Sequence, residues 1–398
     1  MKKSDPEQKV LGQTYRAGFP SASSETEIPA NRLKHLRFGF VYDSENSHIT
    51  AQNLRDAIAD DQITHFDLNF AKPDADIDQF LCLAIGQEKS PDLILHETGA
   101  PGLPRGLHKV SIPTVLLDID TFGWTSFRLK WALLFDYIFT WHPSYVQQFQ
   151  EAGHPRVFAL PHAVDAELFG EINPNQERLY DLGFVGNSEL AQYRKRDRVI
   201  SQLAKLYRTN DFRRGYGKKD MAEVYKLSRI VVNVSRAEYP QEANMRCYEA
   251  MAGGALLITG MPTELTEWGF LEGVHFVGWR SESDVFDLVA RYLRDEEKRN
   301  EIAQAGRERT LTRFTCQQCI DSIASTVARD NGEVFAPARG WPPEDIHLLY
   351  LSYYYCYRLH CAALEEFRLL RRTNPRAYWK GLPMVVKTLR HAIRSSLM

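Results

Sequence analysis

The segment from Ile230 to Thr259 constrains the fold most, because it spells out a complete strand, loop, helix and strand. The β-branched run Ile230–Val234 predicts a buried strand, and Met245–Ala252 predicts a helix that a glycine pair ends. A second apolar strand, Ala255–Thr259, follows directly. This order is a βαβ unit of a parallel sheet. The loop and the helix N-terminus then lie at the carboxyl edge of the sheet, where such sheets bind ligands.

The start of this helix is suited to an anion. Free backbone N–H groups and the positive end of the helix dipole gather near Ala243–Met245, and Arg246 adds a guanidinium suited to phosphate. Glu249 follows Asn244 by roughly 7 Å along the helix axis, comparable to the span from a nucleotide diphosphate to its ribose. Its carboxylate could accept both ribose hydroxyls. Spacing alone is equally consistent with an ordinary crossover helix carrying an exposed Arg246–Glu249 ion pair.

Three strings in the second half of the chain carry a family resemblance: NMRCYEAMAGGALLIT, TELTEWGFLEGVHFVGW and RYLRDEEKRNEIAQAGRERTLTRFT. They resemble sugar-nucleotide glycosyltransferases of the B fold, most closely the CgeB-like group related to glycosyl transferases group 1. In that superfamily two glutamates separated by seven residues mark the nucleotide site, and the second holds the ribose. Glu249 matches the second. Gln241 stands at the first position with Glu242 beside it, so the first glutamate is absent or displaced.

The resemblance implies an α/β protein with two Rossmann-like domains facing across a cleft and with C-terminal crossing helices. A length of 398 residues allows two domains of ordinary size. We expect a flexible leader over 1–35, an acceptor-side domain over 36–172 and a nucleotide-sugar domain over 178–330. A helical extension with a basic tail follows over 331–398. Cys316 and Cys319 form a CxxC pair without a second pair or nearby histidines, which favours a structural role over a zinc or redox site.

A second phosphate-binding feature is expected at the start of the second domain. The string GFVGNS ends a strand, and Arg194, Lys195 and Arg196 follow one or two turns later, so backbone and cations could both approach a phosphate. A glycine-containing turn beside a solvated basic face is the plainer interpretation. The predicted donor-binding set comprises Gly186, Asn187, Arg194, Asn244, Arg246, Tyr248 and Glu249.

Sugar transfer also needs a base for the acceptor's proton in many cases. Asp118 and Asp120 end a buried apolar strand with i, i+2 spacing, so both can point toward one side of the cleft. His96, followed by Glu97, ends another strand at the same edge, and His142 is a further candidate. We predict Asp118, Asp120 and His96 as catalytic, while structural roles for each remain open. No metal is expected, because transferases of the B fold generally work without one.

The overall composition bounds the partners. A net charge of −2 gives no electrostatic footprint for nucleic acid, and no apolar stretch is long enough to span a bilayer. The polar N-terminus lacks a signal peptide's apolar centre, so we expect a cytoplasmic protein. After Glu366 the chain carries eight Lys or Arg and no acid, interleaved with apolar residues. This basic amphipathic tail predicts peripheral contact with the inner face of the membrane, although it could also clamp the first domain and present a solvated face.

The predicted function is glycosyl transfer, of hexosyltransferase type, from a nucleotide-diphosphate sugar to a glycan, lipid-linked or protein acceptor in the interdomain cleft. Such a role suits polysaccharide or glycoconjugate biosynthesis. The nucleotide sugar is the donor substrate, and no permanently bound cofactor is expected. Two alternatives stay open: a sugar-nucleotide epimerase of the same fold, and a noncatalytic surface or coat-assembly scaffold with a vestigial nucleotide site.

Overall fold

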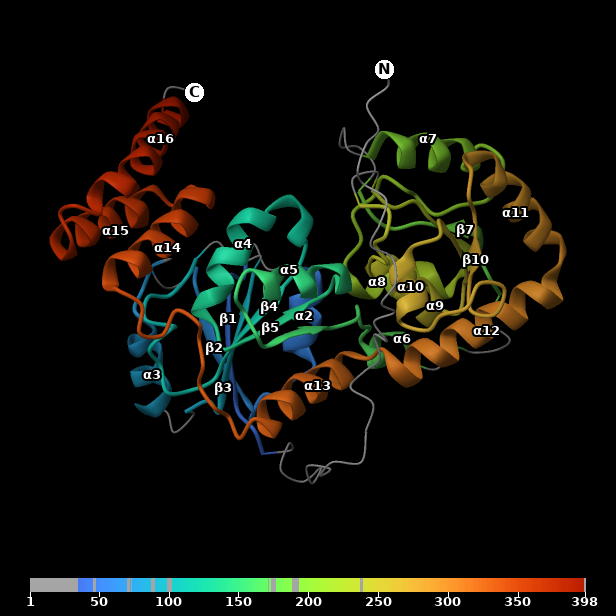
Figure 1. Ribbon diagram of the computed structural model, residues 1–398. Helices are drawn as coiled ribbons and strands as arrows, with labels where there is room; N and C mark the ends of the chain where they lie inside the picture. Colours follow the sequence, from blue (N-terminus) through green and yellow to red (C-terminus); the bar gives the residue numbers. More distant parts are fainter. Residues whose placement is uncertain are drawn as a thin grey trace, which may run out of the picture.

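The protein consists of two parallel sheets, each covered by helices (Figure 1). The computed structural model describes residues 35–45, 48–69, 72, 74–86, 90–98, 102–170, 172, 177–187, 193–236 and 239–396. The leader expected over 1–35 lies outside these residues except for His35. The sequence prediction of an α/β fold with two Rossmann-like domains is confirmed.

The first sheet has the strand order β2-β1-β3-β4-β5-β6, and every neighbouring pair is parallel. Its strands are β1 (Phe38–Tyr42), β2 (Ile63–Asp67), β3 (Leu93–Glu97), β4 (Thr114–Asp118), β5 (Tyr137–Thr140) and β6 (Val157–Ala159). Its helices are α2 (Ile49–Asp56), α3 (Ile77–Gly86), α4 (Thr125–Trp131), α5 (Val146–Glu151) and, leading away from it, α6 (Ala166–Phe169).

The second sheet has the order β10-β9-β8-β7 and is also parallel. Its strands are β7 (Tyr180–Gly183), β8 (Ser228–Asn233), β9 (Leu256–Thr259) and β10 (Val277–Gly278). Its helices are α7 (Arg194–Leu203), α8 (Lys218–Lys226), α9 (Met245–Ala252), α10 (Thr263–Glu267), α11 (Glu282–Arg294) and α12 (Glu296–Arg313). The βαβ unit predicted from the sequence is therefore β8-α9-β9.

Alternating strand residues divide between two cores in each domain, as expected for a sheet buried on both faces. In β4, for example, Val115 and Leu117 pack on the α2 side, whereas Leu116 packs on the α4 side. In β8, Val231 packs with α8 and α9, whereas Ile230 packs with α7, α11 and α12. Both sheets therefore present only their strand ends to ligands.

Helix α13 (Cys316–Arg329) joins the two domains. It directly follows α12 of the second domain, but its apolar side packs on α2 and the first sheet. Residues 316–329, which we expected in the second domain, thus belong to the core of the first. Cys316 and Cys319 are buried in that core with no disulfide, which fits the structural role favoured from the sequence.

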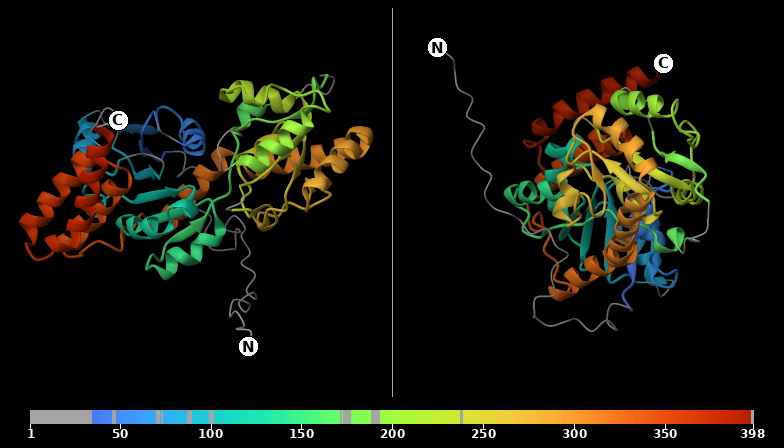
Figure 2. Two further views of the ribbon diagram at one scale, coloured as in Figure 1. Left: turned by 90° about the horizontal axis from the view of Figure 1, so that it is seen from above. Right: turned by 90° about the vertical axis from the view of Figure 1, so that its right-hand side faces the viewer.

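The C-terminal extension forms α14 (Pro343–Cys356), α15 (His360–Thr373) and α16 (Tyr378–Ser396). These helices lie against the first domain on the side away from the second, as two views agree (Figures 1 and 2). Arg358, with φ +56°, lies between α14 and α15 and separates them. Helix α16 continues through Pro383. No helix among the described residues is long and apolar enough to cross a membrane.

Candidate functional site

A cavity of about 300 Å³ lies at the carboxyl edge of the second sheet and reaches the first domain at Ile49. Most of its wall comes from three places: the end of β7, the start of α8 and the loop that leads into α9. The lining residues that argue for a ligand are charged: Arg196, Lys218, Arg236, Glu242, Arg246 and Glu249. A cavity with this many charges on one wall is suited to a polar, anionic ligand.

Arg246 is held in place at the first turn of α9. Its Nη1 donates to Asn233 Oδ1 at 2.7 Å, and its Nε donates to the carbonyl of Val185 at 2.8 Å. The guanidinium lies over the ring of Phe184 at 4.4 Å. A Cβ on Gly186 would come within 2.0 Å of Arg246 Nη2, and Gly186 has a φ of +146°. Gly186 is therefore required both for its backbone conformation and for the close approach of Arg246.

Arg196 brings a second guanidinium to the same cavity. Its Nε donates to the carbonyl of Val234 at 2.9 Å, and its Nη1 donates to the carbonyl of Asn187 at 2.7 Å. Burial, and then repulsion by Arg246, lowers the pKa of Arg196 to about 10. Two buried guanidiniums that repel each other stabilise a bound anion more than either would alone.

Glu249 lies one turn further along α9 and lines the cavity with its side chain buried. Burial raises its pKa to about 7, against the lowering effect of the Arg246 charge. Among the residues that the structure describes, the Glu249 carboxylate has no hydrogen-bond partner; the backbone carbonyl of Glu249 is bonded to the N–H of Gly253 at 2.9 Å. The exposed Arg246–Glu249 ion pair that spacing alone allowed is absent from this part of the chain, and the carboxylate is free to accept hydrogen bonds from a ligand.

Glu242 is a cavity residue that the sequence pattern did not identify as such. It is buried, and its Oε2 has no hydrogen-bond partner among the described residues. Burial, and then the charge of Asp120, raises its pKa to about 7, while Arg236 acts in the opposite direction. Gln241, which occupies the expected position of the first glutamate, is exposed. The structure thus brings the neighbouring Glu242, rather than Gln241, to the cavity.

The predicted donor-binding residues divide into two groups. Asn187, Asn244, Arg246 and Glu249 line the 300 Å³ cavity, and Gly186 lines an adjoining cavity of about 320 Å³ beside Tyr216. Arg194 is exposed and lines neither cavity. Tyr248 points into the domain core, where its ring packs on His162, Phe270 and Phe314. Arg196, rather than the predicted Arg194, reaches the cavity. Helix periodicity explains this difference, because Arg196 lies two residues from Arg194 and so faces a different side of α7.

The two predicted aspartates do not point the same way. Asp118 is fully buried. Its carboxylate accepts hydrogen bonds from Arg128 Nη1 at 2.9 Å and from Thr140 Oγ1 at 3.2 Å. Asp120 adopts a left-handed conformation with φ +56° and faces Arg236 of the second domain at 3.7 Å. Of the two carboxylates, therefore, Asp118 is enclosed by its own partners within the first domain, and Asp120 is the one that faces the second domain.

The predicted histidine His96 lies in the core of the first domain. It is buried against Phe135, and its Nε2 is 2.9 Å from the carbonyl of Gly102. Burial lowers its pKa to about 4. The structure does not bring His96 to the cavity, because its ring lies within the sheet's packed face.

His142, the further candidate, lies at the seam between the domains. Its Nδ1 is 3.0 Å from Glu264 Oε1, and Tyr239 Oη donates to the same oxygen at 3.1 Å. Burial opposes a charge on His142, but the hydrogen bond and the charge of Glu264 outweigh it, so the pKa of His142 is raised. The ring of Phe122 stacks on Tyr239 at 5.1 Å. These contacts join the two domains next to Asp120 and Glu242.

Comparison with known proteins agrees with this fold. Residues 166–325 match the family model described as "Glycosyl transferase-like". HepE from Anabaena, solved in complex with UDP-glucose, superposes with a TM-score of 0.52 at 14% identity and covers 74% of this chain and 100% of its own. Sucrose-phosphate synthase from Thermosynechococcus elongatus gives a TM-score of 0.51 at 11% identity over 74% of this chain and 99% of its own. No curated protein matches the sequence. The resemblance to B-fold glycosyltransferases is confirmed, and the chain has their fold.

Proposed function

We propose that this protein transfers a sugar from a nucleotide-diphosphate donor, held by the second domain, to an acceptor that enters from the first. The observation that carries the proposal is the grouping of two buried guanidiniums, Arg196 and Arg246, with the unbonded carboxylate of Glu249 in one interdomain cavity. Diphosphate oxygens suit the guanidiniums, and ribose hydroxyls suit the carboxylate. HepE, which shares the fold, binds UDP-glucose.

In the proposed reaction an acceptor hydroxyl attacks the anomeric carbon of the donor sugar. The bond from that carbon to the diphosphate oxygen breaks, and the electron pair leaves with the diphosphate, where Arg196 and Arg246 stabilise the developing charge. The hydroxyl proton passes to Asp120, the described carboxylate of the first domain that faces the cavity residue Arg236. Glu242, buried near Asp120 and Arg236, would accept hydrogen bonds from hydroxyls of the transferred sugar. We infer a hexosyl donor from the family resemblance.

The test is a thermal-shift screen of the full chain against nucleotide sugars, followed by product analysis with candidate acceptors. A ligand at one hundred times its dissociation constant should stabilise the protein by about 2.7 kcal/mol. Stabilisation by a nucleotide sugar together with transfer to an acceptor supports the proposal. Formation of a new sugar isomer without any acceptor would instead identify an epimerase. The absence of stabilisation by every nucleotide sugar would point to a scaffold.

We also propose that the C-terminal helices bring the protein to an anionic membrane surface, which would suit a lipid-linked acceptor. The supporting observation is the exposed basic face of α15 and α16. Arg371, Arg372, Arg376 and Lys380 are exposed there, and Trp379 is 68% exposed among them. Lysine and arginine are attracted to anionic lipid headgroups, and tryptophan favours the interface.

A further inference from the structure

The loop that carries Asp120 is held in place by the buried ion pair between Arg128 and Asp118. Arg128 of α4 is buried, and its Nη1 contacts Asp118, the carbonyl of Ile119 and, at 2.8 Å, Thr98 Oγ1. Asp118 accepts a further hydrogen bond from Thr121 Oγ1. The residues on both sides of Asp120 are therefore tied to a single buried pair, which fixes the backbone where Asp120 takes its left-handed conformation.

Thr98 connects this pair to the strand next to it. Its Oγ1 accepts from the backbone N–H of Ile119 at 3.0 Å and donates to the Ile119 carbonyl at 3.3 Å. Its own N–H donates to the carbonyl of Leu117 at 3.1 Å. Thr98 is thus bonded to the chain on either side of Asp118, so a displacement of Thr98 would move the Asp120 loop.

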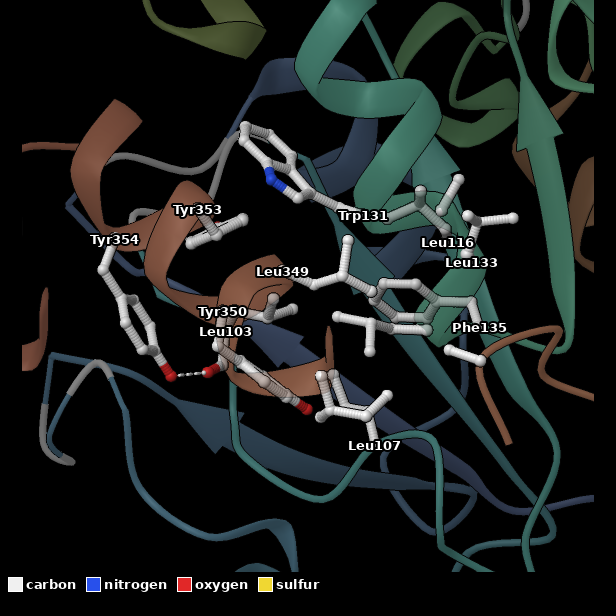
Figure 3. Close-up of a cluster of buried hydrophobic side chains, with 14 of the residues drawn as sticks. Leu103, Leu107, Leu116, Trp131, Leu133, Phe135, Leu349, Tyr350, Tyr353 and Tyr354 are labelled. Atoms are coloured by element: carbon white, nitrogen blue, oxygen red, sulfur yellow. Dashed lines mark hydrogen bonds between the residues drawn. The ribbon is translucent and has the colours of Figure 1, made fainter. Parts of the chain in front are cut away.

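The C-terminal extension holds Thr98 from the other side. Tyr357, the residue that follows α14, donates its hydroxyl to the Thr98 carbonyl. Its ring stacks on Tyr353 at 4.5 Å and contacts Trp131 at 5.7 Å. Three tyrosines of α14 donate to carbonyls of the loop that follows β3, namely Tyr350 to Pro104 at 3.1 Å, Tyr353 to Gly102 at 3.1 Å and Tyr354 to Leu103 at 2.8 Å. Figure 3 shows the bond between Tyr354 and Leu103.

We propose that the C-terminal helices are part of the catalytic frame, and that Tyr357 positions Asp120 through Thr98 and the Arg128–Asp118 pair. The inference rests on the proposed function, because the proposed function makes Asp120 the base. The chain of contacts from Tyr357 through Thr98 to the Arg128–Asp118 pair, which we call the clamp, is a property of the fold. Asp118 is then a positioning residue and not the base. Tyr357 bonds to Thr98, the residue that contacts the Asp120 loop, whereas Tyr350 bonds to Pro104, so Tyr350 serves as a matched control.

The experiment compares Tyr357→Phe with Tyr350→Phe in the full chain, because removal of Asp118 itself would leave the buried Arg128 unpaired and unfold the site. Each change removes one tyrosine hydroxyl that donates to a backbone carbonyl of the same loop. We expect hydrogen exchange of the backbone amides of 119–124 to accelerate about five- to tenfold in Tyr357→Phe, the scale of one lost hydrogen bond, and to stay unchanged in Tyr350→Phe. Equal protection of 119–124 in both variants would overturn the clamp. This readout needs no transferase activity, so it separates failure of the clamp from failure of the proposed function.

Turnover then tests whether the clamp acts through Asp120. Asp120→Asn should slow turnover about 100-fold, the usual scale of general-base catalysis, without weakening donor binding. Tyr357→Phe should lower kcat about fivefold with KM for the donor unchanged, and should have less than a twofold effect in the Asp120→Asn background. An undiminished effect in that background would show that Tyr357 acts elsewhere and would overturn the link to Asp120.

Discussion

At the residue scale, Glu249 is the most direct test of the donor site, because its side chain lines the cavity without contributing a hydrogen bond to the described part of the fold. We expect Glu249→Ala to stay folded and to lose at least tenfold in affinity for a nucleoside diphosphate. Two charge-assisted hydrogen bonds to ribose would contribute roughly 1.5–3 kcal/mol each. Calorimetric titration measures this loss, and the exposed Gln241→Ala of the neighbouring loop serves as the control. Unchanged affinity of Glu249→Ala for the nucleoside diphosphate would show that Glu249 does not bind the ribose.

The buried carboxyls Glu242 and Glu249 make the ligand-free protein sensitive to pH. Both have a pKa raised from 4.5 to about 7, chiefly by burial. Between these values the folded state holds more protons than the unfolded state, so the free energy of unfolding falls as the pH rises through this window. Each group contributes at most about 1.4 kcal/mol per pH unit. We expect Glu242→Gln and Glu249→Gln each to make the free energy of unfolding, measured with denaturant, decrease less steeply with rising pH. The exposed Glu308→Gln should leave this pH dependence unchanged. A wild-type stability that rises between pH 5 and 7 relative to both variants would contradict the assignment.

At the scale of elements, the turn after β7 and the start of α9 form one unit, because Gly186 leaves the space that Arg246 occupies. In Gly186→Ala the new methyl group would displace the guanidinium and strain a backbone with φ +146°. We expect a fold close to the wild type by circular dichroism and a loss of nucleotide affinity similar to that of Arg246→Ala. Gly217→Ala is the control, since a Cβ there meets nothing within 4 Å. If Gly186→Ala bound nucleotide normally, Arg246 would not be the diphosphate contact.

The β8-α9-β9 unit could be predicted because its signals are local: a β-branched strand, a polar loop and a glycine pair that ends the helix. The wall of the cavity could not be predicted in the same way. Arg196, Arg236 and Glu242 reach it only because separate elements converge at one sheet edge. Likewise, the i, i+2 spacing of Asp118 and Asp120 predicted a shared direction. The strand ends at Asp118, and the left-handed turn at Asp120 redirects the second carboxylate.

At the scale of the whole molecule, long-range packing decides which domain each C-terminal helix joins. The apolar, aromatic segment that begins at Pro343 folds back on itself as α14 and α15, and α16 returns over both, with Gly381 allowing close contact with Leu351 and Leu370. Aromatic residues of α14 pack on the same side of the first sheet as α4. No local pattern distinguishes this arrangement from a helix that spans both domains, because both would bury the same apolar residues.

The packing of α15 and α16 also determines what remains outside. Leu370, Ala377 and Val385 of this segment are buried in the apolar cluster that these helices share with α14 and the first domain, and the exposed residues of the segment form a basic face. Its exposed cations are Arg368, Arg371, Arg372, Arg376, Lys380 and Lys387. Two acids lie near this face: Glu365, which pairs with Arg368 at 3.2 Å, and Glu344, which bonds to Asn374 at 2.8 Å. The positive charge therefore outweighs the negative charge by several units on this side of the molecule.

Removal of α16 would expose the apolar residues beneath it, so surface substitutions test the membrane proposal more cleanly than truncation. We expect the full chain to sediment with anionic vesicles but not with neutral ones, and to be released by high salt, since each cation near the surface contributes at most ~1 kcal/mol. Arg371→Gln combined with Lys380→Gln should reduce this binding at least tenfold, and Trp379→Ala should reduce it further by removing the residue placed at headgroup depth.

The matched control for this experiment is a double neutralisation on the second domain, Arg280→Gln with Arg291→Gln, because both residues are exposed and change the net charge equally. If the C-terminal face is the membrane contact, the control variant should sediment as the wild type does, since a non-specific charge effect would weaken both variants alike. Sedimentation of the Arg371→Gln/Lys380→Gln variant at the wild-type level would exclude this face as the anchor. Binding to anionic vesicles that persists in high salt would likewise contradict an electrostatic attachment, because the contacts are exposed and therefore screened.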